Sequence, residues 1–252
     1  MKFFKMQGLG NDFVVFEGPT QLATERIVAL CDRRTGIGAD GVLVATRLDD
    51  AVQMTYWNAD GSVAEMCGNG LRCVAQLAMR NGWVDPRGFT VRAAISDHPA
   101  QRVGADLVRA RVGTAATLAP EVSSCGVEFH TVSIGNPHAV TFVDRVADAP
   151  VRTVGPDVEV DGQFPHRTNV EFASVRARDH IDLRVWERGV GETNACGTGA
   201  AATVFAAHQR GTVDNRVTVS LPGGDLLIEI DGDAVWMEGP AEFVYTGTLP
   251  TT

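Results

Sequence analysis

Two short motifs of the same form, far apart in the chain, limit what it can fold into. They are Cys67-Gly-Asn-Gly and Cys196-Gly-Thr-Gly, and an apolar run with helical spacing follows each of them. Glycines after a cysteine let the backbone approach a ligand closely, and a helix N-terminus carries unpaired N–H groups. The motifs therefore predict two similar halves, each with one cysteine at the start of a helix.

The landmarks around the two cysteines lie in register. Asn58 precedes the first cysteine at the same spacing at which Glu187 precedes the second. A Gly-Asn pair, ending at Asn11 or Asn136, lies upstream in each half at a similar spacing. These landmarks predict a divergent internal duplication of one α/β plan.

The predicted fold class is α/β of the α+β type, with two pseudo-symmetric halves. In each half a mostly antiparallel sheet or barrel curls round a central helix, because strand-like runs separated by turn residues lie on both sides of the helical run. The region 115–124 contains Pro120 and few charges, and it is the expected boundary. The expected domains are residues 1–117, which carry Cys67, and residues 118–242, which carry Cys196.

Charge and hydropathy argue against several classes of partner. The net charge of −9, from 22 basic and 31 acidic residues, is unsuited to a nucleic acid or to an anionic membrane surface. No apolar run approaches the length of a membrane span, and no secretion signal precedes the first strand. We therefore expect a cytoplasmic protein with a small-molecule substrate.

The cysteine pattern indicates reduced thiols. The number of cysteines is odd and none has C-x-x-C spacing, which argues against a disulfide framework and against a structural metal site. Three of them lack the glycine context and are interpreted as packing residues. The five cysteines are Cys31, Cys67, Cys73, Cys125 and Cys196.

The lysine content argues against one cofactor. The only lysines, Lys2 and Lys5, lie in the first predicted strand. A pyridoxal-phosphate enzyme needs a Schiff-base lysine in its active site. Amino-acid chemistry here is therefore expected to proceed without that cofactor.

Paired cysteines at helix N-termini suit the inversion of a stereocentre. The helix dipole and free N–H groups favour a thiolate, so the pKa of each thiol is expected to fall. If both halves face one cleft, two helix N-termini bind one carboxylate while two sulfurs flank its α-carbon. One thiolate removes the α-proton, the other thiol supplies one on the opposite face, and N–H dipoles stabilise the enolate-like intermediate. The two titrations are coupled.

Each element also has a simpler interpretation. A lone cysteine before glycines is more often a small buried residue than a nucleophile. Asn11 and Asn136 are equally well explained as turn residues, and His138 as a turn histidine. Arg188 is placed either to form a surface ion pair with Glu187 or to bind a substrate carboxylate through two hydrogen bonds.

At these residues the chain resembles the diaminopimelate epimerase family, and the shared motifs span it from end to end. The motifs that carry the resemblance are Met6-Gln-Gly-Leu-Gly-Asn11-Asp-Phe, Arg34-Thr-Gly36-Ile-Gly-Ala-Asp40-Gly, Asn58-Ala-Asp-Gly-Ser, Cys67-Gly-Asn-Gly with Arg72-Cys73, Gly135-Asn136-Pro-His138, and Glu187-Arg188-Gly with Ala195-Cys196-Gly-Thr-Gly.

The resemblance implies a cofactor-independent isomerase that interconverts LL- and meso-2,6-diaminopimelate in lysine and peptidoglycan precursor biosynthesis. It implies a homodimer, and a C-terminal tail, about 243–252, that returns to the first domain. Cys67 and Cys196 would be the acid/base pair, with His138 and Glu187 tuning their pKa values. The substrate-binding residues implied are Asn11, Asn58, Gly68, Asn69, Asn136, Asn169, Glu187, Arg188, Gly197 and Thr198, of which Gly68, Asn69, Gly197 and Thr198 cradle the reacting carboxylate.

One position departs from the pattern of many members. Gly41 stands where many members have a glutamine that contacts substrate, which puts that contact in doubt here. Within enzymes, a proline or hydroxyproline racemase is the alternative, and it would not need the distal set formed by Asn58, Asn169 and Glu187-Arg188. A thiol redox or metal-binding protein is the alternative from another class, and a catalytically inactive relative is disfavoured because both cysteines are present.

Overall fold

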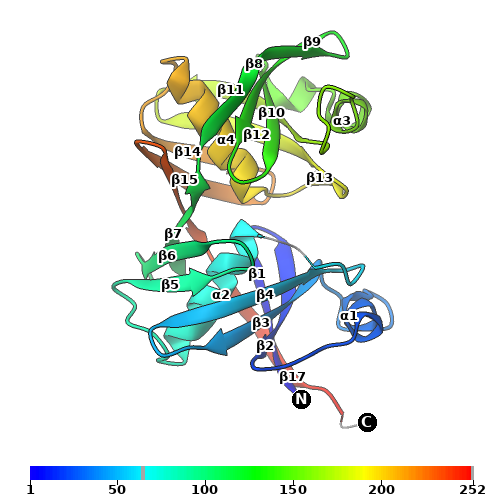
Figure 1. Ribbon diagram of the computed structural model, residues 1–252, viewed down its shortest axis with the longest axis vertical. Coiled ribbons are helices and arrows are strands. Elements are labelled where there is room, and N and C mark those ends of the chain that lie inside the picture. Colours follow the sequence, from blue (N-terminus) through cyan, green and yellow to red (C-terminus); the bar gives the residue numbers. More distant parts are fainter. Residues whose placement is uncertain (64–65, 251–252) are drawn as a thin grey trace. The chain divides into compact units, whose positions relative to one another are not determined.

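The computed structural model describes residues 1–63 and 66–250, and the chain divides into two compact units (Figure 1). Residues 1–110 and 238–252 form unit 1, and residues 111–237 form unit 2. Ala64 and Glu65 of the loop before Cys67, and Thr251 and Thr252 of the expected returning tail, lie outside the described residues.

Unit 1 contains a mixed sheet with two helices, each of which connects a pair of parallel strands. In order across the sheet, its strands are β17 (Glu242–Thr248), β1 (Lys2–Gly8), β2 (Asn11–Glu17), β3 (Gly41–Arg47), β4 (Ala51–Asn58), β5 (Phe89–Arg92), β6 (Asp97–Arg102) and β7 (Leu107–Thr114). The β2–β3 and β4–β5 pairs are parallel and the other pairs are antiparallel. Helix α1 (Thr24–Cys31) connects the first parallel pair and α2 (Gly68–Arg80) connects the second.

Unit 2 repeats this pattern. In order across its sheet, the strands are β8 (Ala116–Ser124), β9 (Val127–Ser133), β10 (Pro137–Phe142), β11 (Asn169–Ala177), β12 (His180–Glu187), β14 (Arg216–Leu221) and β15 (Gly224–Asp231). The β10–β11 and β12–β14 pairs are parallel, connected by α3 (Val151–Glu159) and α4 (Gly197–Gln209). A short 3-10 helix (Val146–Asp148), β13 (Gly191–Thr193) and β16 (Ala234–Pro240) complete the elements.

The two units therefore share one order of strand pairing and one placement of helices. In each, a helix opened by a Cys-Gly-x-Gly motif makes the second parallel crossover, from β4 to β5 or from β12 to β14. Asn58 ends β4 and Glu187 ends β12, which explains their equal spacing from the two cysteines. The predicted α+β fold of two pseudo-symmetric halves is confirmed.

Helix α2 is fixed by its sequence at both ends. Cys67 is its N-cap, and Cys67 Sγ accepts a hydrogen bond from the Gly70 N–H at 3.4 Å. Asn81 is the C-cap, and Gly82 follows in the left-handed region that favours glycine. Every residue between Gly68 and Met79 is buried against strands that include β1, β3 and β4. Burying one large apolar side chain stabilises the fold by about 1.5–3 kcal/mol, so the whole stripe fixes the position of the helix.

Helix α4 holds its place with small side chains. Its apolar residues run round the whole helix, and Ala200, Ala201 and Ala202 are fully buried. A helix that is apolar on all sides is a core helix. It packs against β9, β10, β11 and β15. Figure 1 shows the helix in the middle of unit 2. Cys196 is its N-cap and accepts from the Gly199 N–H at 3.3 Å.

The structure differs from the sequence-based expectations in three places. The region 115–124, expected to contain the domain boundary, is largely strand β8. The chain instead divides after Ala110 and after Met237, within strands β7 and β16. Helix α3 was not predicted, because Gly155 and Pro156 lower its helix propensity. Cys125 is exposed in the β8–β9 turn, so its interpretation as a packing residue is wrong, whereas Cys31 and Cys73 are buried as expected.

In the described parts of the chain, no helix is both long and apolar enough to span a membrane. The terminal strand β17 pairs with β1 from Lys2↔Thr248 to Gln7↔Glu242.

Candidate active site

The cluster in unit 1 gathers around Asn11. The Oδ1 atom of Asn11 accepts from Asn69 Nδ2 at 3.3 Å and, when Cys67 is protonated, from its thiol at 3.7 Å. Its Nδ2 donates to Asp40 Oδ2 at 2.8 Å. Asn11 begins β2 and Cys67 begins α2, so two elements distant in sequence meet here. The structure therefore brings together three of the predicted residues of this half, Asn11, Cys67 and Asn69.

A fully buried cation lies behind this cluster. Arg72, one turn into α2, is 0% exposed, and its guanidinium donates to Asn69 Oδ1 at 2.9 Å and to the Pro240 carbonyl at 3.1 Å. Burial lowers the pKa of Arg72 to about 10, and the negative charge that Cys73 or Cys67 carries when ionised acts in the opposite direction. The attraction between these charges favours the thiolate form of Cys67.

A network of ion pairs holds Asp40, which in turn bonds the Asn11 side chain. Asp12 bonds the Lys5 ammonium at 2.5 Å and the Arg33 guanidinium at 2.7 Å, and Arg33 also reaches Asp40 Oδ1 at 2.6 Å. Burial raises the pKa of Asp12, but the hydrogen bonds from Arg33 and Lys5 outweigh it and hold that pKa at about 2. Asp40, held in this way, positions the Asn11 amide. Lys5 is thus committed to an ion pair.

Asn58 and Gly41 lie opposite each other in the β3–β4 pair. The Asn58 amide donates to Ser62 Oγ at 3.0 Å, within the turn that follows β4. A Cβ atom on Gly41 would lie 2.5 Å from the Trp57 carbonyl oxygen and 2.6 Å from the Tyr56 ring. A glutamine at position 41 would therefore require a shift of the β4 backbone.

The cluster in unit 2 surrounds Cys196, which is 6% exposed. The Thr198 hydroxyl lies 3.6 Å from Cys196 Sγ, and Asn136 Nδ2 donates to Thr198 Oγ1 at 3.5 Å. His138 Nε2 lies 3.0 Å from Asn136 Oδ1. Of the predicted residues in this half, Cys196, Thr198, Asn136 and His138 are thus joined in one chain.

The pKa of Cys196 is raised, not lowered as the sequence led us to expect. Burial is the largest cause, and the charges of Glu187 and Glu171 add to it. The hydrogen bonds from Thr198 and Gly199 lower the pKa, but they do not offset burial and the two charges. The expectation rested on the helix N-terminus alone, whereas desolvation of the thiolate has the larger effect here.

Glu187 is partly buried beside the same thiol. Its Oε1 atom accepts from Thr193 Oγ1 at 2.5 Å. Burial raises the pKa of Glu187 to about 7, while the hydrogen bonds from Thr193 and Cys196 lower it. Two acidic groups, Glu187 and Cys196, therefore share a site that has little contact with water.

The raised pKa of Glu187 gives stability a defined pH dependence. The unfolded chain loses this proton near pH 4.5, whereas the folded chain keeps it to about pH 7. The contribution of Glu187 to the free energy of unfolding is therefore fully present below pH 4.5 and is lost as pH rises through about 7. The loss amounts to up to about 3 kcal/mol. We expect Glu187→Gln to remove this slope when urea unfolding is measured at pH 5 and pH 8. The exposed Glu25→Gln should keep the wild-type slope, and an unchanged slope in Glu187→Gln would contradict the assignment.

Asn169 and Arg188 are both held by hydrogen bonds between side chains and backbone groups. Asn169 is opposite His138 in the β10–β11 pair, and its amide donates to the Pro137 carbonyl at 2.9 Å and accepts from the Arg188 N–H at 3.0 Å. The exposed Arg188 guanidinium donates to the His166 carbonyl at 3.1 Å, not to Glu187. The structure therefore gives Arg188 a position beside Asn169 rather than the surface ion pair considered above.

Sequence reasoning missed Glu171. It is 0% exposed on β11, and Oε1 lies 2.7 Å from His138 Nδ1. A single acidic residue between Val170 and Phe172, at alternate spacing from Asn169, was the available signal, because alternation places Glu171 on the same face as Asn169.

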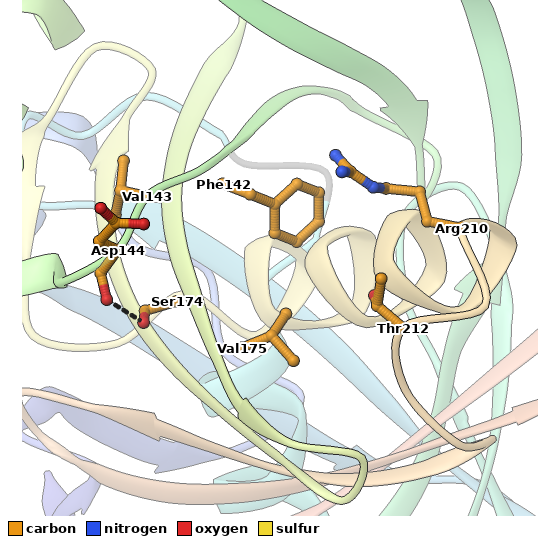
Figure 2. A pocket seen from close by; sticks show the side chains of 7 residues that line it. All are labelled: Phe142, Val143, Asp144, Ser174, Val175, Arg210 and Thr212. Atoms are coloured by element: carbon orange, nitrogen blue, oxygen red, sulfur yellow. Dashed lines mark hydrogen bonds between the residues drawn. The ribbon is translucent and has the colours of Figure 1, made fainter.

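A separate hollow of about 350 Å³ lies in unit 2 (Figure 2). Its lining includes Phe142, Ser174 and Arg210, and the Ser174 hydroxyl donates to the Asp144 carbonyl at 2.8 Å. Arg210 is the C-cap of α4, whereas Cys196 is its N-cap. The 13-residue helix is roughly 20 Å long, so the hollow is distinct from the cysteine cluster. Within residues 1–63 and 66–250, no three His, Cys, Asp or Glu side chains are grouped to hold a metal ion.

Sequence comparison identifies close relatives. The sequence model of the diaminopimelate epimerase family matches residues 3–100 and 130–244 of this chain. The diaminopimelate epimerase of Microcystis aeruginosa is 42% identical over 276 residues, covering 98% of each chain. That of Desulforudis audaxviator is 43% identical over 273 residues, again covering 98% of each.

Structural comparison finds the same fold at lower identity. A predicted epimerase from Pseudomonas aeruginosa has a TM-score of 0.79 at 16% identity and covers 100% of this chain and 99% of its own. A hydroxyproline epimerase from Agrobacterium vitis has a TM-score of 0.74 at 13% identity, covering 98% of this chain and 91% of its own. The racemase alternative thus shares the fold, but the sequence matches favour the other family.

Proposed function

The chain belongs to the diaminopimelate epimerase family, and from that premise we propose how it converts LL-2,6-diaminopimelate to the meso form. Cys67 and Cys196 are the two bases, one for each face of the reacting α-carbon. The observation that carries this proposal is that each cysteine caps a helix and its sulfur accepts an N–H bond from the residue three positions on. The enzyme is an isomerase.

The proton transfers balance without a further reactant. A thiolate removes the α-proton and becomes a thiol, which leaves an enolate-like carboxylate. The opposite thiol gives its proton to the other face of the carbon and becomes a thiolate. N–H groups of the two helix N-termini, at Gly68 and Asn69 and at Gly197 and Thr198, stabilise the charge on the carboxylate.

We infer that Cys67 is the thiolate of the resting enzyme and Cys196 the thiol. Arg72 places a buried positive charge near Cys67. Burial raises the pKa of Cys196, and the charge of Glu187 adds to this effect. The half-exposed Cys67 is thus suited to begin the reaction as a thiolate, and the buried Cys196 is suited to begin it as a thiol.

The distal end of the substrate sets specificity in this proposal. Asn11, Asn58, Asn136, Asn169, Glu187 and Arg188 bind the second ammonium and carboxylate, or line the site. Buried polar groups left unpaired by a smaller amino acid are costly, so simple amino acids such as alanine are poor substrates.

Three broader properties belong to the same proposal. The reaction needs no pyridoxal phosphate, a view supported by the absence of any lysine besides Lys2 and Lys5 in the sequence. The family resemblance implies a homodimer, and the location expected from the sequence is the cytoplasm. The product serves lysine and peptidoglycan precursor biosynthesis.

The test is turnover of LL-diaminopimelate by the wild-type protein in deuterated water under reductant. We expect the meso product to carry one deuterium at the inverted carbon, while unreacted LL substrate stays protiated early in the reaction, because each face has its own base. Mass spectrometry and optical rotation measure both. Equal early labelling of substrate and product would contradict two bases, and no turnover would contradict the activity.

A further inference from the structure

Glu171 is a buried acidic residue to which neither the family resemblance nor the reaction assigns a role. It lies on β11 between core residues, and its Oε2 atom accepts no hydrogen bond from the described residues. A Cβ atom on Gly199, in the first turn of α4, would lie 2.8 Å from Glu171 Oε1. The carboxyl group therefore lies against the same helix N-terminus that Cys196 caps.

Four hydrogen-bonded steps connect Glu171 to the Cys196 sulfur. Glu171 Oε1 is 2.7 Å from His138 Nδ1, and His138 Nε2 is 3.0 Å from Asn136 Oδ1. Asn136 Nδ2 donates to Thr198 Oγ1 at 3.5 Å, and Thr198 Oγ1 is 3.6 Å from Cys196 Sγ. All five residues belong to unit 2.

The direction of each bond follows from which atoms can donate. Asn136 Oδ1 only accepts, so His138 Nε2 carries hydrogen. Thr198 Oγ1 accepts from Asn136, which leaves the Thr198 hydroxyl hydrogen free to point at Cys196 Sγ. His138 Nδ1 faces a carboxyl oxygen, so a second proton lies between His138 and Glu171. The pair thus holds one proton more than a neutral histidine beside a carboxylate.

We propose that Glu171 is a positioning residue that holds this extra proton on His138 and thereby directs a chain of donors, ending with the Thr198 hydroxyl, at the Cys196 thiolate. A charged imidazolium donates more strongly than a neutral ring, and donors in series polarise one another. The proposal rests on the proposed function only in treating Cys196 as a base.

The charges around Cys196 mean that two different roles of Glu171 predict opposite changes in the pKa of Cys196. The titratable groups whose charges act on it are Glu187 from β12 and Glu171 from β11, and the charge of His138 on β10 acts on both glutamates. Burial raises the pKa of Glu171, and the charge and hydrogen bond of His138 lower it. Taken alone, the charge of Glu171 disfavours the thiolate. A purely electrostatic or structural role therefore predicts that removing this charge lowers the pKa of Cys196 or leaves it unchanged. Action through His138 predicts the opposite, because the imidazolium is lost.

The first experiment titrates the Cys196 thiolate in the substrate-free, full-length protein. Ultraviolet thiolate absorbance is recorded against pH, and the matching Cys196→Ser variant supplies the difference curve. We expect Glu171→Gln to raise the midpoint by about one pH unit, which is tenfold less thiolate at a fixed pH below it. A fall, or no change, overturns the proposal. Asp214→Asn, which removes an exposed carboxyl group paired with Arg178 in the same unit, should match the wild type.

A double-mutant comparison tests whether Glu171 acts through His138. In a His138→Gln background, Glu171→Gln should no longer raise the midpoint, because no imidazolium remains to be lost. An equal rise in both backgrounds overturns the proposal. Neither titration uses diaminopimelate, so failure here is distinct from failure of the proposed function.

A measurement on the wild-type chain keeps the proposal testable if Glu171→Gln does not fold. Nitrogen-15 NMR of labelled histidine should show a hydrogen on each ring nitrogen of His138 in the folded, substrate-free chain, with the resonance assigned by its loss in His138→Gln. A bare nitrogen at His138 overturns the proposal. Thermal melting of each variant establishes that it is folded.

Discussion

Replacing either Cys67 or Cys196 with alanine is expected to lower the rate of epimerisation about a thousandfold or more. General acid–base groups contribute about 10²–10⁴ in rate, and each thiol is the only base proposed for its face of the carbon. Both variants should remain folded, because alanine removes one sulfur atom and keeps the backbone of the helix start. The measurement is conversion of LL- to meso-diaminopimelate by optical rotation.

Isotope exchange separates a lost base from a damaged site. A variant with one remaining thiol can remove and return a proton on one face only. In deuterated water, Cys67→Ala and Cys196→Ala should therefore each label one isomer without inverting it, and the two variants should label different isomers. Cys125→Ser, at an exposed turn, is the matched control and should behave as wild type. Labelling of the same isomer by both variants would contradict the assignment of one thiol to each face.

The duplicated plan was predictable because its signals are local. A cysteine before Gly-x-Gly and an apolar stripe indicate an N-cap and a buried helix whatever surrounds them, and both α2 and α4 follow. The strand ends at Asn58 and Glu187 could be placed by spacing for the same reason. Helix α3 lies outside this rule, since Gly155 packs directly against the Trp186 ring and tertiary contact outweighs its low propensity.

The electrostatics of the site were not predictable from local pattern. The dipole at a helix start is the same at Cys67 and Cys196, but burial and neighbouring charges come from distant elements. Arg72 lies one turn along α2, whereas Glu171 and Glu187 reach Cys196 from β11 and β12. The two units are thus similar scaffolds, and the residues that neighbour each cysteine make the two thiols different. A two-base inversion uses that difference, because one sulfur must begin charged and the other protonated.

A side chain at position 36 is expected to destabilise the fold strongly, because Gly36 lies in a tight loop. The loop after α1 closes the helix end, with the Gly36 N–H donating to the Asp32 carbonyl at 3.0 Å and the Ile37 and Gly38 N–H groups to the Leu30 carbonyl at 3.0 Å. A Cβ atom on Gly36 would lie 2.0 Å from the Ala29 carbonyl oxygen and 2.9 Å from those of Leu30 and Asp32. The loop cannot keep these bonds with any side chain at position 36.

We expect Gly36→Ala to lower the free energy of unfolding by about 3 kcal/mol or more, through overpacking of about 1–3 kcal/mol and loss of bonds worth about 1 kcal/mol each. Urea unfolding followed by circular dichroism measures it. Gly88→Ala is the matched control, because its added Cβ meets no atom within 4 Å, and it should change stability by less than about 0.5 kcal/mol. Equal stability of the two variants would contradict this description of the helix end. The same loop leads to Asp40, which holds Asn11 beside Cys67, so loosening it should also slow epimerisation in the fraction that stays folded.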